Sequence, residues 1–414
     1  MTDEKRNHLS DLRGASKLAI DATRGVTDLV EAMHDTIAGL APIVGAPRKG
    51  RTRGITGLVY RSIRGVTGLV GAGIDAALGR LVPLLGQTSS PKEAEIVRAV
   101  LNGVLGDYLA ATNNPLVIEM RLRRGGQPLT LDREALKAAI PDATGKIVVM
   151  VHGSSMCDLQ WSRAGLDFGA LLERDLGATA VYLNYNSGLH ISTNGRGFSD
   201  LLERLVAEWP APIESLNVVA HSMGGLVTRS ACHAALNPLP TDPAAPATQA
   251  PYRWPTLLRK VILLGTPHHG APLERGGNWI DAILGVSPYS APFARLGKIR
   301  SAGVTDLRYG SILDEDWTGR DRFALGEDPR RPTPLPPGTD WYAIAASMDS
   351  HPAEGRRPKG DGLVHVDSAL GQHGTADHTL AIPLARQWIA YGMGHLDLLY
   401  RPEVYEVISR WLGE

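Results

Sequence analysis

Six short apolar runs constrain the fold of this chain more than any other feature of its sequence. Each is rich in valine and isoleucine, and segments with helical spacing separate several of them. Such alternation is typical of a mostly parallel sheet with helices on both faces. The sequence therefore predicts an α/β fold. The runs are KIVVMVHG (146–153), TAVYLNYN (179–186), SLNVVAHS (215–222), KVILLGTP (260–267), WYAIAASM (341–348) and QWIAYGMGH (387–395).

Residues 1–112 precede these runs and are predicted to form an N-terminal helical extension. Apolar residues recur at helical spacing from Val26 onward and again over 55–74. The stretches RGVTDLV, RGITGLV and RGVTGLV are near copies of one another, and the last two begin eleven residues apart, so their apolar faces align. A third helix is expected over 92–109. The α/β domain is then predicted to occupy 113–414.

Positive charge is concentrated in one part of the predicted extension. Seven lysine and arginine residues and one acidic residue, Asp75, lie between Arg48 and Arg80. A basic helix with an apolar face can lie on an anionic membrane or another lipid surface. Seven glycines between 54 and 79 favour close packing against other helices instead, because each glycine costs a free helix about 1 kcal/mol. We favour packing and keep peripheral contact with a lipid surface as the alternative.

A long segment interrupts the pattern of strands and helices. Residues 271 to about 338 contain Trp279, Tyr289, Phe293 and Trp317 among many glycines and prolines. Ordered connections of this length are uncommon unless they serve a function. We therefore predict an inserted cap over this segment, near the mouth of any site at the edge of the sheet.

The composition excludes several classes of protein. Lysine and arginine number 43, as do aspartate and glutamate, so the formal net charge is zero and no nucleic-acid partner is expected. Two scattered cysteines, Cys157 and Cys232, predict neither a disulfide framework nor a zinc cluster. The charged start MTDEKRNHLS precedes no apolar signal segment, and no apolar run reaches the length of a membrane span. A cytoplasmic location is the expectation.

The stretch VVAHSMGGLV sets Ser222 on a turn between a predicted strand and a predicted helix. Such a turn exposes the serine hydroxyl at the carboxyl end of a strand, where a histidine can remove its proton. The turn also brings backbone segments close together, and the small residues Ala220, Gly224 and Gly225 fit that demand. The alternative is a serine that only caps the following helix.

Two further stretches bear on the same chemistry. Acyl transfer needs two backbone amides that face the developing oxyanion, one of them from the loop after an earlier strand. In VVMVHGSS, Gly153 allows that loop to approach closely, so the amides of Ser154 and Met223 are the predicted donors. The stretch LLGTPHHGAP fits the rim of a cleft. Its adjacent His268 and His269 point apart without an accompanying carboxylate pattern, so no metal site is predicted there.

Together, HSMGGL, VHG after a strand and GTPHHG resemble the lipase branch of the α/β-hydrolase superfamily, with its bacterial lipases and GPI inositol-deacylase-like esterases. The resemblance covers roughly residues 145–412 and implies a triad in the chain order Ser, Asp, His. KGDGLVHVDSALG resembles the stretch that carries the acid, which is Asp361. YGMGHLDLLYRPEVYEVISRWL resembles the last element, in which His395 precedes a C-terminal helix. Ala220 departs from the family's G-x-S-x-G pattern.

Other residues compete for two of these three places. Asp349 follows a predicted strand directly and suits the superfamily's geometry, whereas the GDGLV motif favours Asp361. Among the histidines, only His395 lies between a predicted strand and a predicted amphipathic helix near the chain end. The remaining alternatives are Asp367, His365, His373 and His378.

The resulting hypothesis is a serine hydrolase that cleaves carboxylic esters of small molecules or lipids. In this mechanism His395 deprotonates Ser222, Asp361 orients the imidazole, and water releases the acyl group. The mechanism needs neither a metal nor a cofactor. An acyltransferase or thioesterase with the same triad is the alternative within enzymes. Outside enzymes, the alternative is a lipid- or granule-surface protein in which the hydrolase domain is only a scaffold.

Overall fold

The computed structural model describes residues 91–163, 165–237, 251–271, 300–320, 322, 328, 330–352, 355 and 357–414. The helices expected over 26–74, with their basic segment, and residues 272–299 of the expected cap lie outside the described residues. The helix expected over 92–109 is confirmed as α3 (Pro91–Ala111). The sheet belongs to a compact unit formed by Leu101–Trp279 and Arg300–Glu414. The domain boundary at 112 stays a prediction.

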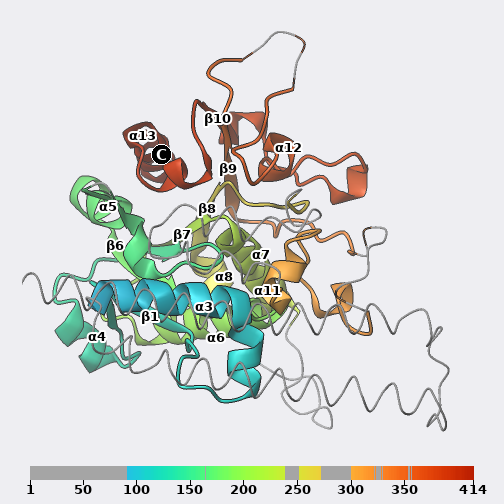
Figure 1. The fold of residues 1–414 in the computed structure, drawn as a ribbon. Helices are drawn as coiled ribbons and strands as arrows, with labels where there is room; N and C mark the ends of the chain where they lie inside the picture. Colours follow the sequence, from blue (N-terminus) through green and yellow to red (C-terminus); the bar gives the residue numbers. More distant parts are fainter. Residues whose placement is uncertain are drawn as a thin grey trace, which may run out of the picture. The chain divides into compact units, whose positions relative to one another are not determined.

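An eight-stranded sheet runs through this unit in the order β10-β9-β8-β7-β3-β6-β1-β2 (Figure 1). Strands β10 to β6 in that order pair in parallel, as expected from the sequence. All six predicted strands are therefore confirmed, with ends that differ by a few residues. They are β3 (Lys146–Val151), β6 (Thr179–Asn184), β7 (Ser215–His221), β8 (Leu258–Leu264), β9 (Asp340–Ser347) and β10 (Gln387–Tyr391).

The antiparallel end of the sheet was not predicted from the sequence. β1 (Arg121–Arg124) pairs with β6 and with β2 (Gln127–Pro128). Its sequence, RLRR, has no apolar alternation, although Leu122 and Arg123 are both buried. Gly125 and Gly126 form the connecting turn with φ of 55° and 77°. Two residues with positive φ match the two-residue turns preferred in hairpins, so the Gly-Gly pair was the available signal.

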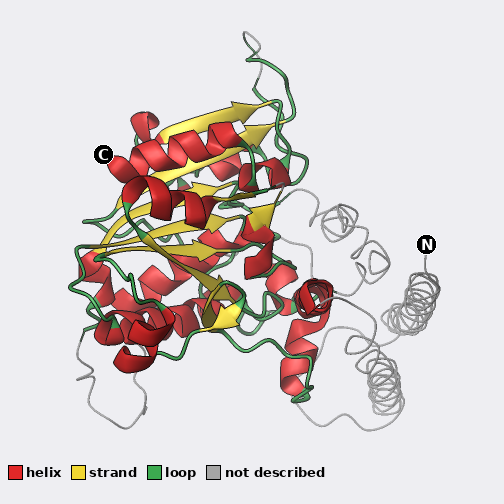
Figure 2. Cartoon of the chain, turned by 90° about the vertical axis from the view of Figure 1, so that its left-hand side faces the viewer, coloured by secondary structure: helices red, strands yellow, loops and turns green. Residues whose placement is uncertain are grey.

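Helices cover both faces of the sheet, as the α/β pattern predicts (Figure 2). Side chains alternate between the faces along a strand, and in β3 both sets are buried. Val148 and Met150 belong to one apolar cluster with residues of α5 (Phe168–Leu176) and α13 (Pro402–Gly413), which lie side by side in Figure 1. Val151 faces the opposite layer, where α7 (Met223–Leu236) packs against α6 (Ile191–Glu208).

Shorter elements complete the unit. The carboxylate of Asp132 caps α4 (Arg133–Ala139) by accepting hydrogen bonds from two of its first backbone amides. No helix within the described ranges combines the length and apolar character needed to cross a membrane. The other short elements are β4 (Ser162–Arg163), β5 (Leu166–Asp167), α8 (Trp254–Leu257), α11 (Ala302–Asp306), α12 (Val366–Ala369) and the 3₁₀ helices η1 (Asp158–Trp161), η3 (Asp314–Asp316), η4 (Ala376–His378), η5 (Leu384–Arg386) and η6 (His395–Leu399).

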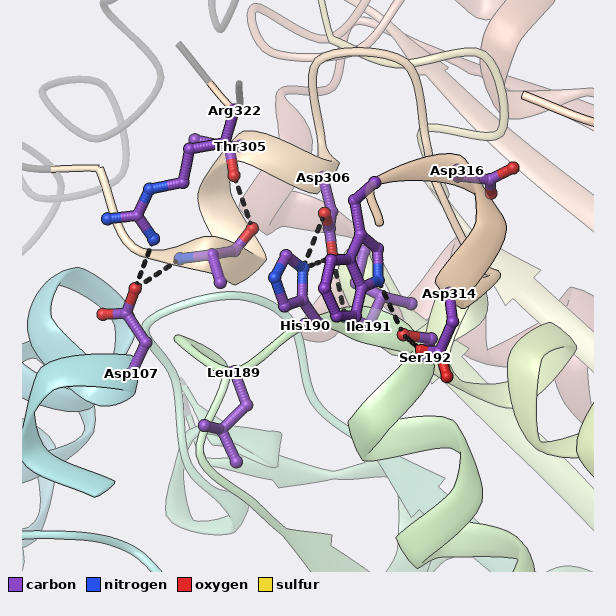
Figure 3. Close-up of polar contacts among 12 residues, drawn as sticks. Asp107, Leu189, His190, Ile191, Ser192, Thr305, Asp306, Asp314, Asp316 and Arg322 are labelled. Carbon is purple, nitrogen blue, oxygen red and sulfur yellow. Dashed lines mark hydrogen bonds and ion pairs between the residues drawn. The ribbon is translucent and has the colours of Figure 1, made fainter. Parts of the chain in front are cut away.

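The described part of the expected cap is anchored to the start of α6 (Figure 3). Both carboxylate oxygens of Asp306 lie 3.1 Å from Nδ1 of His190, and one of them accepts a hydrogen bond from the amide of Ile191 at 2.8 Å. The His190 ring stacks on Trp317 with 3.8 Å between centroids. Ser192 donates a hydrogen bond to Asp314 at 2.6 Å. These contacts hold residues 301–317 against the sheet unit.

Candidate active site

The turn between β7 and α7 has the tight geometry expected of a nucleophile turn. Ser222 adopts φ 55° and ψ −125°, a conformation that costs a residue with a side chain about 1–3 kcal/mol. Its amide donates a hydrogen bond to the carbonyl of Leu264 at 2.8 Å. A Cβ atom at Gly224 would lie 2.6 Å from the carbonyl oxygen of His152, and one at Gly225 would lie 2.0 Å from Thr266 Oγ1. Close approach therefore requires glycine at both positions.

The side chain of Ser222 is buried and stabilises no described neighbouring element through a hydrogen bond. It makes no capping hydrogen bond to α7, which removes the capping alternative. Among the described residues, its Oγ has no hydrogen-bond partner. The loop after β3 lies directly against it, because a Cβ at Gly153 would be 2.9 Å from Ser222 Cβ. A strained, buried hydroxyl beside a glycine loop is costly unless it serves a function.

The loop after β3 is held from two sides. The Tyr185 ring stacks on His152 at 4.4 Å, and its hydroxyl donates a hydrogen bond to the His152 carbonyl at 3.0 Å. Further along, the amide of Ser155 donates a hydrogen bond to Ser187 Oγ at 2.9 Å. Ser154 lies between these anchors and is buried. The predicted oxyanion loop is thus a fixed segment next to Ser222.

Asp361 and His395 form a buried pair. The distance from Asp361 Oδ2 to His395 Nδ1 is 2.7 Å, and both side chains are at most 4% exposed. The other carboxylate oxygen of Asp361 accepts hydrogen bonds from the amides of Leu363 at 2.9 Å and Val364 at 2.8 Å. The amide of His395 also donates to the carbonyl of Asp361 at 3.1 Å. These contacts fix both the carboxylate and the imidazole.

The pair and the serine turn meet at the end of β8. Leu264 accepts the hydrogen bond from the Ser222 amide, and a Cβ on the next residue, Gly265, would lie 3.1 Å from His395 Nδ1. His221, which precedes the serine, lies 4.7 Å from His395 between ring centroids, and its Nε2 is 3.2 Å from the His395 carbonyl oxygen. Three segments distant in sequence therefore bring Ser222, His395 and Asp361 to one edge of the sheet.

The alternative acids and histidines have other contacts. Asp349 accepts a hydrogen bond from the amide of Lys359 at 2.7 Å, and its carbonyl accepts one from Gly392 at 2.8 Å. Asp367 pairs with Arg357 at 2.9 Å. His365 is exposed, and the rings of His373 and His378 contact each other at 5.1 Å. Of the residues considered, Asp361 is the acid that His395 contacts.

His268, the first histidine of GTPHHG, contacts Arg229 of α7. His268 is fully buried, with Nδ1 3.3 Å from a guanidinium nitrogen of Arg229, and its carbonyl accepts a hydrogen bond from Arg330 at 2.6 Å. No cluster of three or more histidine, cysteine, aspartate or glutamate side chains suited to a metal ion occurs in the described part of the chain.

Two histidines that were not predicted as site residues border the site. His152 ends the run of β3 and His221 ends β7, and both are fully buried. Burial lowers the pKa of His152 to about 4 and, together with the nearby His395, holds the pKa of His221 well below its usual value. Their positions at the carboxyl ends of apolar strands were the available signal. Both imidazoles are therefore neutral near pH 7.

Buried neutral histidines make the protein sensitive to acid. Burial lowers the pKa of His152, His221 and His268 in the folded chain, whereas in the unfolded chain histidine keeps a pKa of about 6.5. Below that pH the unfolded state binds more protons, so the free energy of unfolding falls by up to about 1.4 kcal/mol per pH unit for each histidine. We expect the Tm to drop between pH 7 and pH 5.

Thermal melting of a matched pair of variants checks this expectation. His268→Asn removes one buried imidazole and should make the Tm less dependent on pH. His365→Asn alters an exposed histidine and should leave the dependence unchanged. Identical melting curves at pH 7 and pH 5 in the parent protein would contradict the expectation.

This chain is similar to known proteins in structure and not in sequence. No protein-family model and no curated protein matches the sequence. The solved structures that match include lipase BlEst2 from Bacillus licheniformis in its mature form, at 17% identity over 64% of this chain and 91% of that one, with a TM-score of 0.40. Lipase 1 from Pelosinus fermentans matches at 12% identity, over 65% and 99% of the two chains, with a TM-score of 0.37. The metagenomic carboxyl esterase MGS0156 matches at 14%, over 76% and 90%, with a TM-score of 0.35. These similar structures are lipases and esterases.

Proposed function

We propose that this chain is a serine hydrolase of carboxylic esters. One observation carries the proposal: a buried, strained serine lies at the same sheet edge as a buried His395–Asp361 pair. A purely structural role explains neither Ser222 nor the His395–Asp361 pair. The Ser222 hydroxyl caps nothing and bonds to no described residue, and burying the Asp361 carboxylate against an imidazole carries a desolvation cost.

The contacts of His395 suit it to act as a general base. The Asp361 carboxylate accepts a hydrogen bond from Nδ1–H of His395. Nε2 is then the nitrogen that takes a proton from Ser222. Asp361 also stabilises the imidazolium that forms, and its second oxygen is held by two backbone amides. The Ser222 hydroxyl and His395 are not hydrogen bonded in this structure. Such contacts often tighten only when substrate is bound.

The oxyanion of the tetrahedral intermediate needs donors that are already in position. We assign this task to the backbone amides of Ser154 and Met223. Met223 is the first residue of α7, where helix amides have no partner within the helix and the helix dipole favours negative charge. Ser154 follows Gly153, whose backbone lies against the serine. Water then hydrolyses the acyl-enzyme and restores Ser222.

Two alternatives share parts of this arrangement. An acyltransferase or thioesterase would use the same residues with another acceptor or leaving group. A lipid-surface protein with an inert scaffold would have no reason to keep Ser222 in a costly conformation, so that alternative is disfavoured. All the enzymatic versions act on an acyl group carried by a small molecule or a lipid, as an ester or a thioester.

A fluorophosphonate probe tests the proposal directly. We expect the native protein to be labelled once, at Ser222, and the peptide that contains it to gain the probe mass. Ser230→Ala is the matched control, because Ser230 is a buried serine on the same helix that donates a hydrogen bond to the Ile312 carbonyl at 2.8 Å. This variant should label normally, and heat-denatured protein should not label.

The same preparation is assayed with p-nitrophenyl esters from acetate to palmitate. Hydrolysis of at least one ester, lost in parallel with labelling, supports the proposal. A native protein that neither labels nor hydrolyses any of these esters would overturn it.

A further inference from the structure

Ser155, in the loop after β3, has a conformation that its neighbours must enforce. Its φ is 58°, and among the described residues only Asn113 and Ser222 share a positive φ without being glycine. The left-handed region costs such a residue about 1–2 kcal/mol. Conformations of this kind persist only when the surrounding structure determines them. Ser155 directly follows Ser154, the proposed oxyanion donor.

Two contacts enforce this conformation. One is the hydrogen bond from the Ser155 amide to Ser187 Oγ at 2.9 Å. The other is the backbone of α3 at Gly103. A Cβ atom on Gly103 would lie 2.0 Å from Ser155 Oγ and 2.7 Å from Ser155 Cα, which is far closer than any real contact of this kind. The helix therefore touches the loop with no room for a side chain.

The second half of α3 cannot easily move away from this contact. A Cβ at Gly188 would lie 2.2 Å from the Asn102 carbonyl oxygen, so a second loop presses on the same helix. Asn186 donates a hydrogen bond to the Gly106 carbonyl at 2.9 Å, and Ser301 donates one to the Gly103 carbonyl at 2.6 Å.

The start of α11 anchors the same half-helix. Asp107 accepts a hydrogen bond from the Ala302 amide at 3.0 Å and pairs with Arg322 (Figure 3). The helix from Leu101 onward belongs to the same compact unit as the sheet and the site. It thus offers a fixed support for the loop.

We propose that α3, through Gly103, is a positioning element for the oxyanion hole. Ser154 is held between Gly153, which lies against Ser222, and Ser155, which lies against Gly103. Fixing Ser155 from the far side fixes the direction of the Ser154 amide. Gly103 touches no substrate and acts only through this loop. The inference rests on the proposed ester hydrolase function and adds a residue outside the motifs of the sequence.

Gly103→Ala tests the proposal because the methyl group must push Ser155 away. Loss of one oxyanion donor costs enzymes about 10²–10³ in kcat. A misdirected donor should cost at least about tenfold. We expect kcat for p-nitrophenyl butyrate to fall by that factor while KM stays within about twofold, since the oxyanion develops in the transition state and is absent from the bound substrate. Affinity for a trifluoromethyl ketone, which forms a tetrahedral adduct with serine, should fall by a similar factor.

Gly195→Ala is the matched packing control. Gly195 lies on α6, and a Cβ there would be 2.2 Å from Ser230 Oγ, so the substitution crowds a serine between two helices in the same way. Both variants should lower the Tm, and only Gly103→Ala should lower kcat and inhibitor affinity. Wild-type kcat and inhibitor affinity in Gly103→Ala, or equal losses in both variants, would overturn the proposal.

Two further variants cover a Gly103→Ala protein that does not fold. Ser187→Ala removes the acceptor of the Ser155 amide and should lower kcat several-fold with little change in KM. Adding Ser155→Gly to Gly103→Ala removes the crowded side-chain atoms and leaves only the close contact with the backbone at 155, so it should restore part of the stability and part of kcat. If Ser187→Ala keeps full kcat and the double variant restores none, the positioning role is wrong. A parent protein without Ser222-dependent hydrolysis would instead overturn the proposed function.

Discussion

Ser222→Ala is expected to remove ester hydrolysis, with kcat falling by roughly 10⁴–10⁶-fold, because the residues of a Ser-His-Asp triad act as a unit and the proposed oxyanion donors and substrate binding would supply only residual activity. The same substitution should leave the Tm unchanged or slightly raise it. The lost hydroxyl is buried and has no hydrogen-bond partner among the described residues, so its removal relieves a desolvation penalty.

Ser230→Ala should have the opposite effects on stability and activity. Its hydroxyl bonds to a buried carbonyl, that of Ile312, and the loss should cost about 1 kcal/mol of stability. Its kcat should stay near that of the parent. Kinetics and thermal melting on both variants therefore give a crossed pattern: one variant is inactive and stable, the other active and less stable. Full hydrolysis by a clean Ser222→Ala preparation would remove Ser222 from the mechanism.

The sequence predicted those parts of the fold that depend on local pattern. The six parallel strands appear as apolar runs because both faces of such a sheet are buried, so nearly every side chain in β3 is apolar. The antiparallel strand β1 was not predicted because its pairing depends on β6 and its sequence is mostly arginine. One of those arginines, Arg123, is buried and forms an ion pair with Asp158 at 3.1 Å. No local sequence pattern indicates this pair.

In the candidate site, too, some features follow from local sequence and others depend on tertiary contacts. Ser222 was predictable because its turn demands small neighbours over a short stretch of sequence. The contact between α3 and the loop after β3 was not, since Gly103 and Ser155 are 52 residues apart and a glycine within a helix does not by itself indicate which segment packs against it. His152 and His221 were visible as residues, but only tertiary packing decides that they are buried and neutral.

The choice between Asp361 and Asp349 shows most directly what sequence leaves open. Both lie in the segment between β9 and β10. Distance in space separates them. Asp361 lies 2.7 Å from His395 Nδ1, whereas Asp349 accepts a hydrogen bond from the Lys359 amide. Motif comparison favoured the same residue, but the contact supplies a physical reason for its proposed role.

Asp361→Asn should therefore lower kcat by roughly 10³–10⁴-fold, and Asp349→Asn by no more than about threefold. An amide at 361 can still accept hydrogen bonds from Leu363 and Val364 through its oxygen, so the fold should survive. Its nitrogen then faces His395 Nδ1 as a donor, which shifts the imidazole proton to Nε2 and removes the base that Ser222 needs. At 349 the amide oxygen can replace the carboxylate oxygen that accepts from Lys359. Steady-state kinetics on both variants, with melting as the check on folding, compares two substitutions of identical size and charge. Equal losses, or a larger loss at Asp349, would transfer the acid to the other carboxylate.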